Sequence, residues 1–121
     1  MTPRPNTTEL YSRSNSGADF IVQTINDLFQ LTKRLGRLED SKPYLRYIER
    51  ITERLEDLGF EVINPLGEAY SETRTDCDAS ISGEECESLV IEEVIKPIIR
   101  VKEGSSSTII QRARVIVSAK A

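Results

Sequence analysis

A chain of 121 residues, 38% hydrophobic and 30% charged, has the size and composition of one globular domain. Its formal net charge of −4 argues against nucleic acid as a partner, because phosphate binding normally needs a basic surface. Histidine is absent, which removes the commonest general base and the commonest metal ligand. We therefore expect a protein that is not an enzyme and that holds no cofactor and no metal.

The chain has no segment typical of membrane insertion or export. No apolar run approaches the ~20 residues of a membrane span. No basic segment followed by an apolar core marks a secretory signal. We therefore expect no membrane association and a cytoplasmic location.

The N-terminal part predicts a flexible arm followed by a helix. Residues 1–15 are polar and contain two prolines, and we interpret them as the arm. The helix is predicted to begin at Ser16, because Ser16 and Asp19 resemble a capping box, and to end at Gly36. Its apolar residues recur at three- and four-residue steps: Phe20, Ile21, Ile25, Leu28, Phe29 and Leu35.

The second predicted helix has the most regular apolar pattern. Ser41 is a candidate N-cap, Pro43 suits the first turn, and Gly59 suits the end of the helix. Five residues follow the a/d spacing of helices that pack along a seam: Tyr44, Ile48, Ile51, Leu55 and Leu58. Two heptads are too short for a lone coiled coil but suit a four-helix bundle of two hairpins. We therefore expect the seam to form a homodimer, with packing inside one monomer as the alternative.

After Gly59 the pattern changes from helix to strand. Residues 60–63 predict a short strand, and the prolines and glycines of residues 64–67 predict a turn. Residues 68–88 are polar and acidic, and predict a long functional or partly disordered loop with at most a short strand near 79–81. Residues 89–101 predict two short strands that meet at Pro97.

Residues 103–107 predict a turn, and residues 108–118 predict one strand with two different faces. The expected core face carries Ile109, Ala113, Val115 and Val117. The expected exposed face carries Ile110, Arg112, Arg114 and Ile116. The sequence thus predicts an α+β fold, with a helical hairpin over residues 16–59 and a small all-β domain over 60–121.

The order of these features resembles the GrpE family of nucleotide exchange factors over about 100 residues. The matching segments are LEDLGFEVINPLGE at residues 55–68 and QRARVIVSAK at residues 111–120. Tyr70 stands where the family has Phe. The resemblance implies a cochaperone for protein folding and stress response. Such a protein binds the nucleotide-binding domain of a DnaK-type chaperone and promotes ADP release.

If the resemblance holds, the β domain binds the open conformer of the chaperone better than the closed one. On the final strand, the expected partner-binding residues are Ile110, Arg112, Arg114 and Ile116. Arginine and isolated apolar residues are typical of interfaces. The alternative is a solvated strand face.

Three departures from the family separate its scaffold from its activity. Polar residues 1–15 stand where the family has a long coiled coil, and residues 71–76 replace a family segment that contains His. The two family arginines that lead into the last strand fall near Thr108 and Gln111. An adaptor or regulator with the same fold and no exchange activity is therefore the second hypothesis.

Cys77 and Cys86 raise a third hypothesis, a thiol-based redox protein. We interpret both as ordinary thiols, because neighbouring carboxylates disfavour the thiolate and no cluster of cations is evident nearby. The acidic residues of the same segment, Asp76, Asp78, Glu84, Glu85 and Glu87, lack the pattern of a calcium-binding loop.

Overall fold

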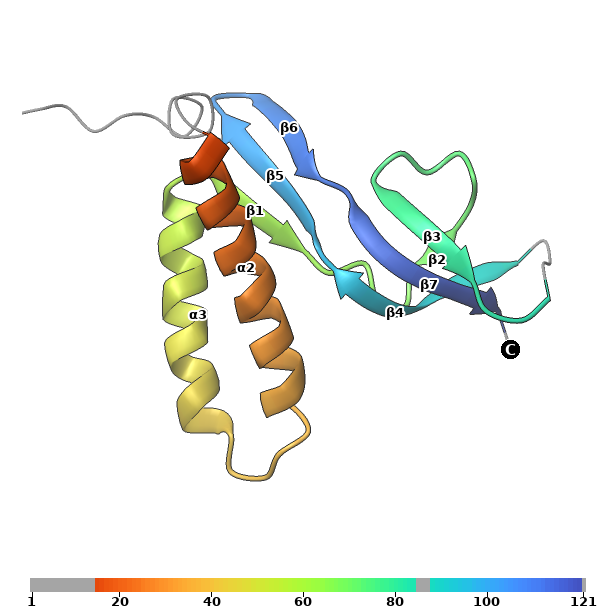
Figure 1. Cartoon of the computed structure of the whole chain (residues 1–121), viewed down its shortest axis with the longest axis horizontal. Helices are drawn as coiled ribbons and strands as arrows, with labels where there is room; N and C mark the ends of the chain where they lie inside the picture. Colours follow the sequence, from red (N-terminus) through yellow and green to blue (C-terminus); the bar gives the residue numbers. More distant parts are fainter. Residues whose placement is uncertain (1–14, 85–87, 121) are drawn as a thin grey trace, which may run out of the picture. The chain divides into compact units, whose positions relative to one another are not determined.

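The computed structural model describes residues 15–84 and 88–120. These residues form two helices followed by seven strands in two sheets, which confirms the predicted α+β class (Figure 1). Contacts group the chain into two compact units. One contains the helices up to Glu61 together with residues 100–108, and the other contains residues 62–99 and 109–120. The predicted arm lies outside the described residues, apart from Asn15.

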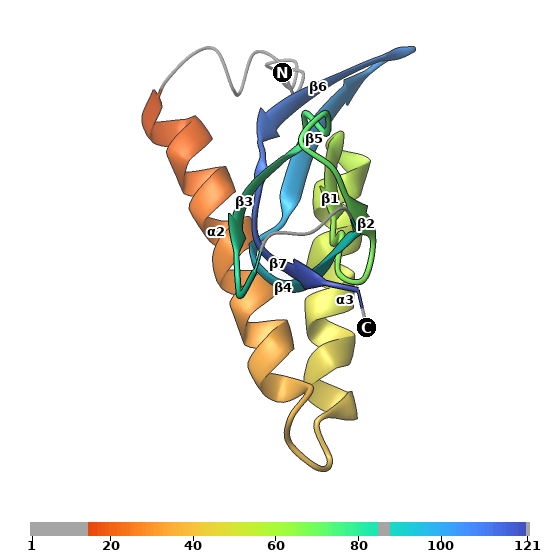
Figure 2. The same ribbon diagram turned by 90° about the vertical axis from the view of Figure 1, so that its right-hand side faces the viewer.

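Helix α2 spans Asn15–Leu35 and helix α3 spans Lys42–Asp57. Figures 1 and 2 show the two helices side by side, joined by a short connection at one end. Ile25 of α2 and Ile48 of α3 are buried, with 2% and 8% of their surfaces exposed. The hairpin therefore has a narrow core, and most apolar side chains of its predicted stripes are only half-buried or exposed.

The predicted helix ends are correct to within one residue, but the capping is not as predicted. Helix α2 begins at Asn15, so Ser16 lies inside its first turn. Ser41 stands at the N-cap of α3, yet its backbone is already helical (φ −84°, ψ −9°) and its side chain caps nothing. A capping side chain needs an extended backbone at this position to reach the amides that follow. Gly59 has the expected positive φ, 97°, directly before the first strand.

The first sheet has the strand order β1-β5-β6, with β1 Phe60–Ile63, β5 Ile98–Glu103 and β6 Ser106–Gln111. Phe60 is 1% exposed, and the Lys102 amide donates to the Gly59 carbonyl oxygen at 2.8 Å. Gly104, with φ 58°, forms the turn between β5 and β6. The predicted short strand is confirmed, whereas the turn predicted over residues 103–107 is shorter, because only Gly104 and Ser105 separate β5 from β6.

The second sheet has the strand order β2-β4-β7-β3. Its strands are β2 Ala69–Tyr70, β3 Cys77–Ile81, β4 Leu89–Lys96 and β7 Ala113–Ala119. Strand β7 is central, antiparallel to β4 and parallel to β3. The buried residues are Cys77, Ile91, Val94, Ala113, Val115 and Val117.

Strand β4 is irregular and meets β5 at Pro97, as predicted. Its pairing with β7 shifts between Ile91 and Glu93 and again between Val94 and Lys96. Such bulges bend a strand and change which side chains reach the core. They explain why Ile91 and Val94, three residues apart, are both buried.

Two predictions about the β part are wrong. The segment 68–88 was expected to be mainly loop, but it contains β2 and β3, and β3 runs over five residues. Residues 108–118 were expected to form one strand, but Arg112 separates β6 from β7. Each strand belongs to a different sheet, which accounts for the break.

Candidate partner-binding face

The last strand presents one core face and one open face. Ala113, Val115 and Val117 are at most 1% exposed, so the predicted core side is confirmed on β7, whereas Ile109, predicted on the same core side, is only half-buried on β6. On the other side, Arg114 is exposed and Ile116 is half-buried. The alternation follows from the period of two along a strand.

The strand register defines the neighbours of these two residues. Arg114 lies between Asp78 of β3 and Lys96 of β4. Ile116 lies between Ser80 of β3 and Glu93 of β4. The open face therefore combines a half-buried apolar residue with charges of both signs, which suits a polar interface with a small apolar anchor.

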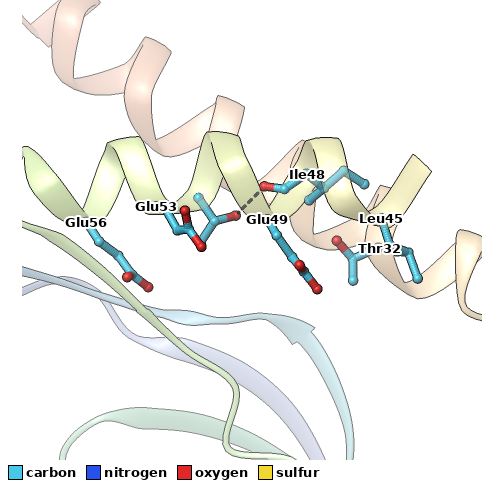
Figure 3. Close-up of a pocket in the computed structure, with 7 residues that line it drawn as sticks. Thr32, Leu45, Ile48, Glu49, Glu53 and Glu56 are labelled. Atoms are coloured by element: carbon cyan, nitrogen blue, oxygen red, sulfur yellow. Dashed lines mark hydrogen bonds between the residues drawn. The ribbon is translucent and has the colours of Figure 1, made fainter. Parts of the chain in front are cut away.

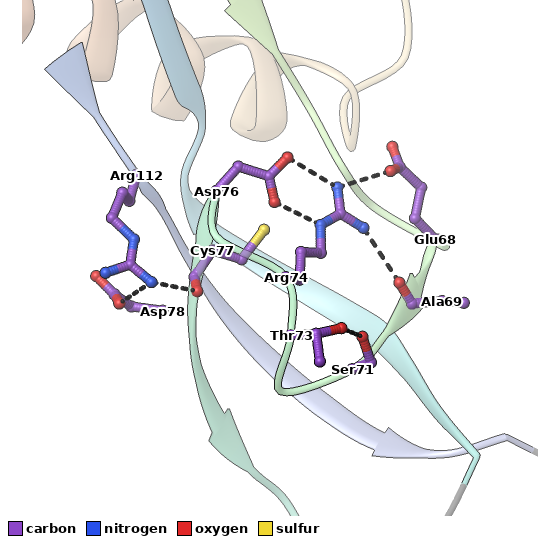
Figure 4. A network of polar contacts seen from close by, with 9 residues as sticks. All are labelled: Glu68, Ala69, Ser71, Thr73, Arg74, Asp76, Cys77, Asp78 and Arg112. Atoms are coloured by element: carbon purple, nitrogen blue, oxygen red, sulfur yellow. Dashed lines mark hydrogen bonds and ion pairs between the residues drawn. The ribbon is translucent and has the colours of Figure 1, made fainter. Parts of the chain in front are cut away.

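Arg112 differs from Arg114 because it has partners inside the chain. Its guanidinium lies 2.9 Å from the Asp78 carboxylate and donates to the Cys77 carbonyl oxygen at 3.1 Å (Figure 4). About half of the Arg112 side chain is exposed (48%), so this pair is worth about 1 kcal/mol at most. Arg112 thus links the start of β7 to β3, and a partner that binds it must compete with Asp78.

Ile110 lies beyond the break at Arg112, on β6, where it is half-buried. The neighbouring Gln111 donates from its side-chain amide to the Pro97 carbonyl oxygen at 2.9 Å. Thr108, the other position where the family has arginine, is exposed on β6. Of the four predicted partner-binding residues, the structure therefore places Arg114 and Ile116 on one strand face, Arg112 at its edge, and Ile110 on the other sheet.

A second polar cluster, which was not predicted, centres on Arg74 (Figure 4). Its guanidinium contacts the Asp76 carboxylate at 2.6 Å, the Glu68 carboxylate at 2.8 Å and the Ala69 carbonyl oxygen at 3.1 Å. The Arg74 and Asp76 side chains are both less than one-fifth exposed. These contacts connect both ends of the segment between β2 and β3.

The contacts around Arg74 shift the pKa values of Arg74, Asp76 and the adjacent Cys77. The hydrogen bond with Asp76 raises the pKa of the Arg74 guanidinium, and the same bond lowers the pKa of the Asp76 carboxyl. Burial raises the pKa of the Cys77 thiol to about 11, and the nearby positive charge of Arg74 offsets only part of this effect. At neutral pH the thiol is therefore protonated and weakly nucleophilic.

The pKa of the Cys77 thiol is raised, as expected, but the main cause of the rise differs from the expected one. The sequence suggested that carboxylates alone would disfavour the thiolate, whereas burial is the largest contribution. The sequence showed no cluster of cations near Cys77, and the one cation that affects its pKa is Arg74. Cys77 is a free thiol that is 1% exposed, and Cys86 lies outside the described residues.

The predicted dimerisation residues are distributed around α3. Ile48 is buried and Leu55 half-buried within the hairpin. Tyr44, Ile51 and Leu58 are 63%, 37% and 40% exposed. Tyr47, which was not predicted, is 64% exposed and lies under the Arg50 guanidinium at 5.5 Å. One chain therefore leaves an apolar stripe of Tyr44, Tyr47, Ile51 and Leu58 uncovered among the described residues.

Comparisons with known proteins gave no match to a family model, a curated protein or a solved structure. Neither helix of the described chain combines the length and apolar character needed to cross a bilayer. Among residues 15–84 and 88–120, no three His, Cys, Asp or Glu side chains are grouped to hold a metal ion.

Proposed function

We propose that this protein is a GrpE-like cochaperone that binds the nucleotide-binding domain of a DnaK-type chaperone and promotes ADP release. The observation that carries the proposal is the order of the elements. A helical hairpin ends at the left-handed Gly59, a strand follows at once, and two small sheets complete the chain. The PLGE segment at residues 65–68 forms a real turn, in which the Glu68 amide donates to the Pro65 carbonyl oxygen.

The proposed mechanism requires binding and no chemistry. Opening of a nucleotide cleft follows when the cochaperone binds the open conformer better than the closed one. A tenfold difference in affinity corresponds to about 1.4 kcal/mol of opening free energy. The proposed contact residues are Arg114 and Ile116, with Arg112 and Ile110 at the edges of the surface.

We also propose that the hairpin makes the protein a homodimer. The support is the uncovered stripe of Tyr44, Tyr47, Ile51 and Leu58 on α3. Phe20 on α2 is 70% exposed and adds apolar surface to the hairpin. Two hairpins that share such surfaces form a four-helix bundle. The proposed location, shared with the chaperone, is the cytoplasm.

A specific observation favours the second candidate, an adaptor with this fold but no exchange activity. Thr108 and Gln111 replace arginines that the family uses against the chaperone, and the Gln111 side chain is bound to Pro97. The redox alternative has less support, because the Cys77 thiol is buried and protonated at neutral pH.

One experiment separates the two candidates. A DnaK-type chaperone is loaded with a fluorescent ADP analogue, and analogue release is followed by stopped flow with and without this protein. Faster release supports the exchange factor. Release at the basal rate contradicts the exchange factor and leaves the adaptor, which would use the same β face on a different partner.

A further inference from the structure

The helical hairpin carries a groove that the proposed function does not use (Figure 3). Its volume is about 440 Å³. All of its lining comes from the hairpin, with one residue from α2 and six from α3. The apolar part is lined by Thr32, Leu45, Ile48 and Thr52, and the acidic part by Glu49, Glu53 and Glu56.

The two threonines behave as apolar residues in this groove. The Thr32 hydroxyl donates to the Leu28 carbonyl oxygen at 2.8 Å, and the Thr52 hydroxyl donates to the Ile48 carbonyl oxygen at 2.9 Å. Because both hydroxyls are satisfied within their own helices, the methyl group is what each threonine offers to an occupant. Together with Leu45 and Ile48, they give the groove an apolar floor.

The three glutamates form an acidic rim along one side of α3. They are spaced by four and three residues, so they follow one another over two turns and about 10.5 Å of helix. All three are exposed. No ion pair within the described residues involves their carboxylates. Arg50, which is close in sequence, lies over the Tyr47 ring.

Within the rim the like charges repel one another. Like charges at a spacing of four residues, as at Glu49 and Glu53, destabilise a helix by a few tenths of a kcal/mol. A second copy of the chain is a poor occupant as well. A two-fold interface through this groove would bring the same glutamates face to face. The negative charge of the rim and the apolar surface of the floor are therefore complementary to an occupant that is positively charged and partly apolar.

We propose that this groove is a docking site for a basic amphipathic helix of a partner protein. Apolar side chains of that helix lie on the floor, and its Lys or Arg residues, at matching three- and four-residue spacings, pair with Glu49, Glu53 and Glu56. A helix is favoured over an extended segment because the groove follows α3 beside α2, and a third helix packs naturally along two others. The site is separate from the stripe of Tyr44, Tyr47, Ile51 and Leu58, which lies on a different side of α3.

The test uses the full chain and a fluorescein-labelled 18-residue peptide that forms an amphipathic helix of leucine and lysine. Fluorescence anisotropy measures its binding in low salt. A scrambled peptide of the same composition, which has no amphipathic helix, is the first control. We expect the helical peptide to bind at least tenfold more tightly than the scrambled one.

Three variants locate the binding. Glu49→Lys with Glu53→Lys should weaken the helical peptide at least tenfold. Glu92→Lys with Glu93→Lys makes the same charge change at exposed residues of β4 and should weaken it less than threefold. Thr52→Ser keeps the hydroxyl, removes one methyl group from the floor and should weaken binding about fourfold. Circular dichroism verifies folding, and the neutral pair Glu49→Gln with Glu53→Gln replaces the lysine pair if that variant is unfolded.

Three results would overturn the proposal. Equal weakening by the two charge variants would show a long-range effect of net charge. Equal binding of the scrambled peptide would show that no helix is recognised. Complete displacement of the peptide by micromolar spermine would identify a small polycation as the occupant.

Discussion

Arg74 is expected to make a large contribution to stability for a residue in a polar connection. The change Arg74→Met removes the guanidinium and leaves the Asp76 carboxylate, 18% exposed, without its charged partner. A hydrogen bond to a charged group in such a position is worth about 1.5–3 kcal/mol. The contact with Glu68, which is 49% exposed, adds less than about 1 kcal/mol. The expected loss is therefore about 2–3 kcal/mol of the free energy of unfolding.

The assay is urea unfolding at pH 7, with Lys102→Met as the control. Lys102 also forms an ion pair, with Glu61, but its side chain is 60% exposed, so its loss should cost about 0.5 kcal/mol or less. The effect of Arg74→Met should also depend on pH. The pKa of Asp76 is lowered in the folded state, so the stabilisation is present above its ordinary value of 3.8 and is lost as the pH falls through the folded value. An Arg74→Met variant as stable as Lys102→Met, or a difference from wild type that does not shrink below pH 4, would refute this reasoning.

Four further predictions concern other parts of the chain. Arg114→Glu should abolish chaperone binding, measured by surface plasmon resonance, and change stability by about 0.5 kcal/mol or less, because the side chain is exposed; full binding by the folded variant would mean that this face is only solvated. Val115→Asp should unfold the β part, seen as loss of the cooperative thermal transition, because Val115 is 1% exposed; a folded variant would mean that the core face is assigned wrongly. Ile51→Asp should give a monomer in sedimentation while the helices remain, because 37% of Ile51 is exposed in one chain; a wild-type chain that is monomeric at tens of micromolar would contradict the dimer. In a Cys86→Ser background, the Cys77 thiol should react with a thiol reagent at pH 8 only after denaturant is added, because it is buried and its pKa is about 11. Fast labelling of the native protein would instead support the redox hypothesis.

Local patterns were sufficient to predict the helices and the core side of the last strand. The end of α3 required only the glycine that follows it, because Gly59 takes the left-handed conformation that other residues avoid. The alternation of Ala113, Val115 and Val117 with polar residues predicted their burial, because the strand lies at the centre of its sheet.

The pairing of strands that are far apart in the chain could not be predicted from the sequence. Strand β3 lies at the edge of its sheet and pairs with β7, more than thirty residues away in the sequence, and no local pattern indicates this pairing. Arg74 meets Glu68 and Asp76 only because the chain turns back between β2 and β3, and no spacing rule marks such a cluster. The break at Arg112 has the same origin, since it depends on which sheet each half of the segment joins.

The acidic groove could not be predicted from the sequence for a different reason. In the sequence, Glu49, Glu53 and Glu56 are three of the many charged residues of α3. Interleaved charges of this kind usually indicate a solvated helix face. Only the packing of α2 against α3 shows that these glutamates border a cavity with an apolar floor. The hydrogen bonds of Thr32 and Thr52 add to this floor, and they too require the structure.

The most direct test of the central claim is the rate of ADP release from a DnaK-type chaperone in the presence of this protein and of its Arg114→Glu variant. The account predicts that the wild-type chain accelerates release of a fluorescent ADP analogue at least tenfold, and that the folded variant does not. Release that remains at the basal rate with saturating wild-type protein would contradict the proposed exchange activity. Acceleration by the variant equal to that of the wild type would contradict the proposed binding face.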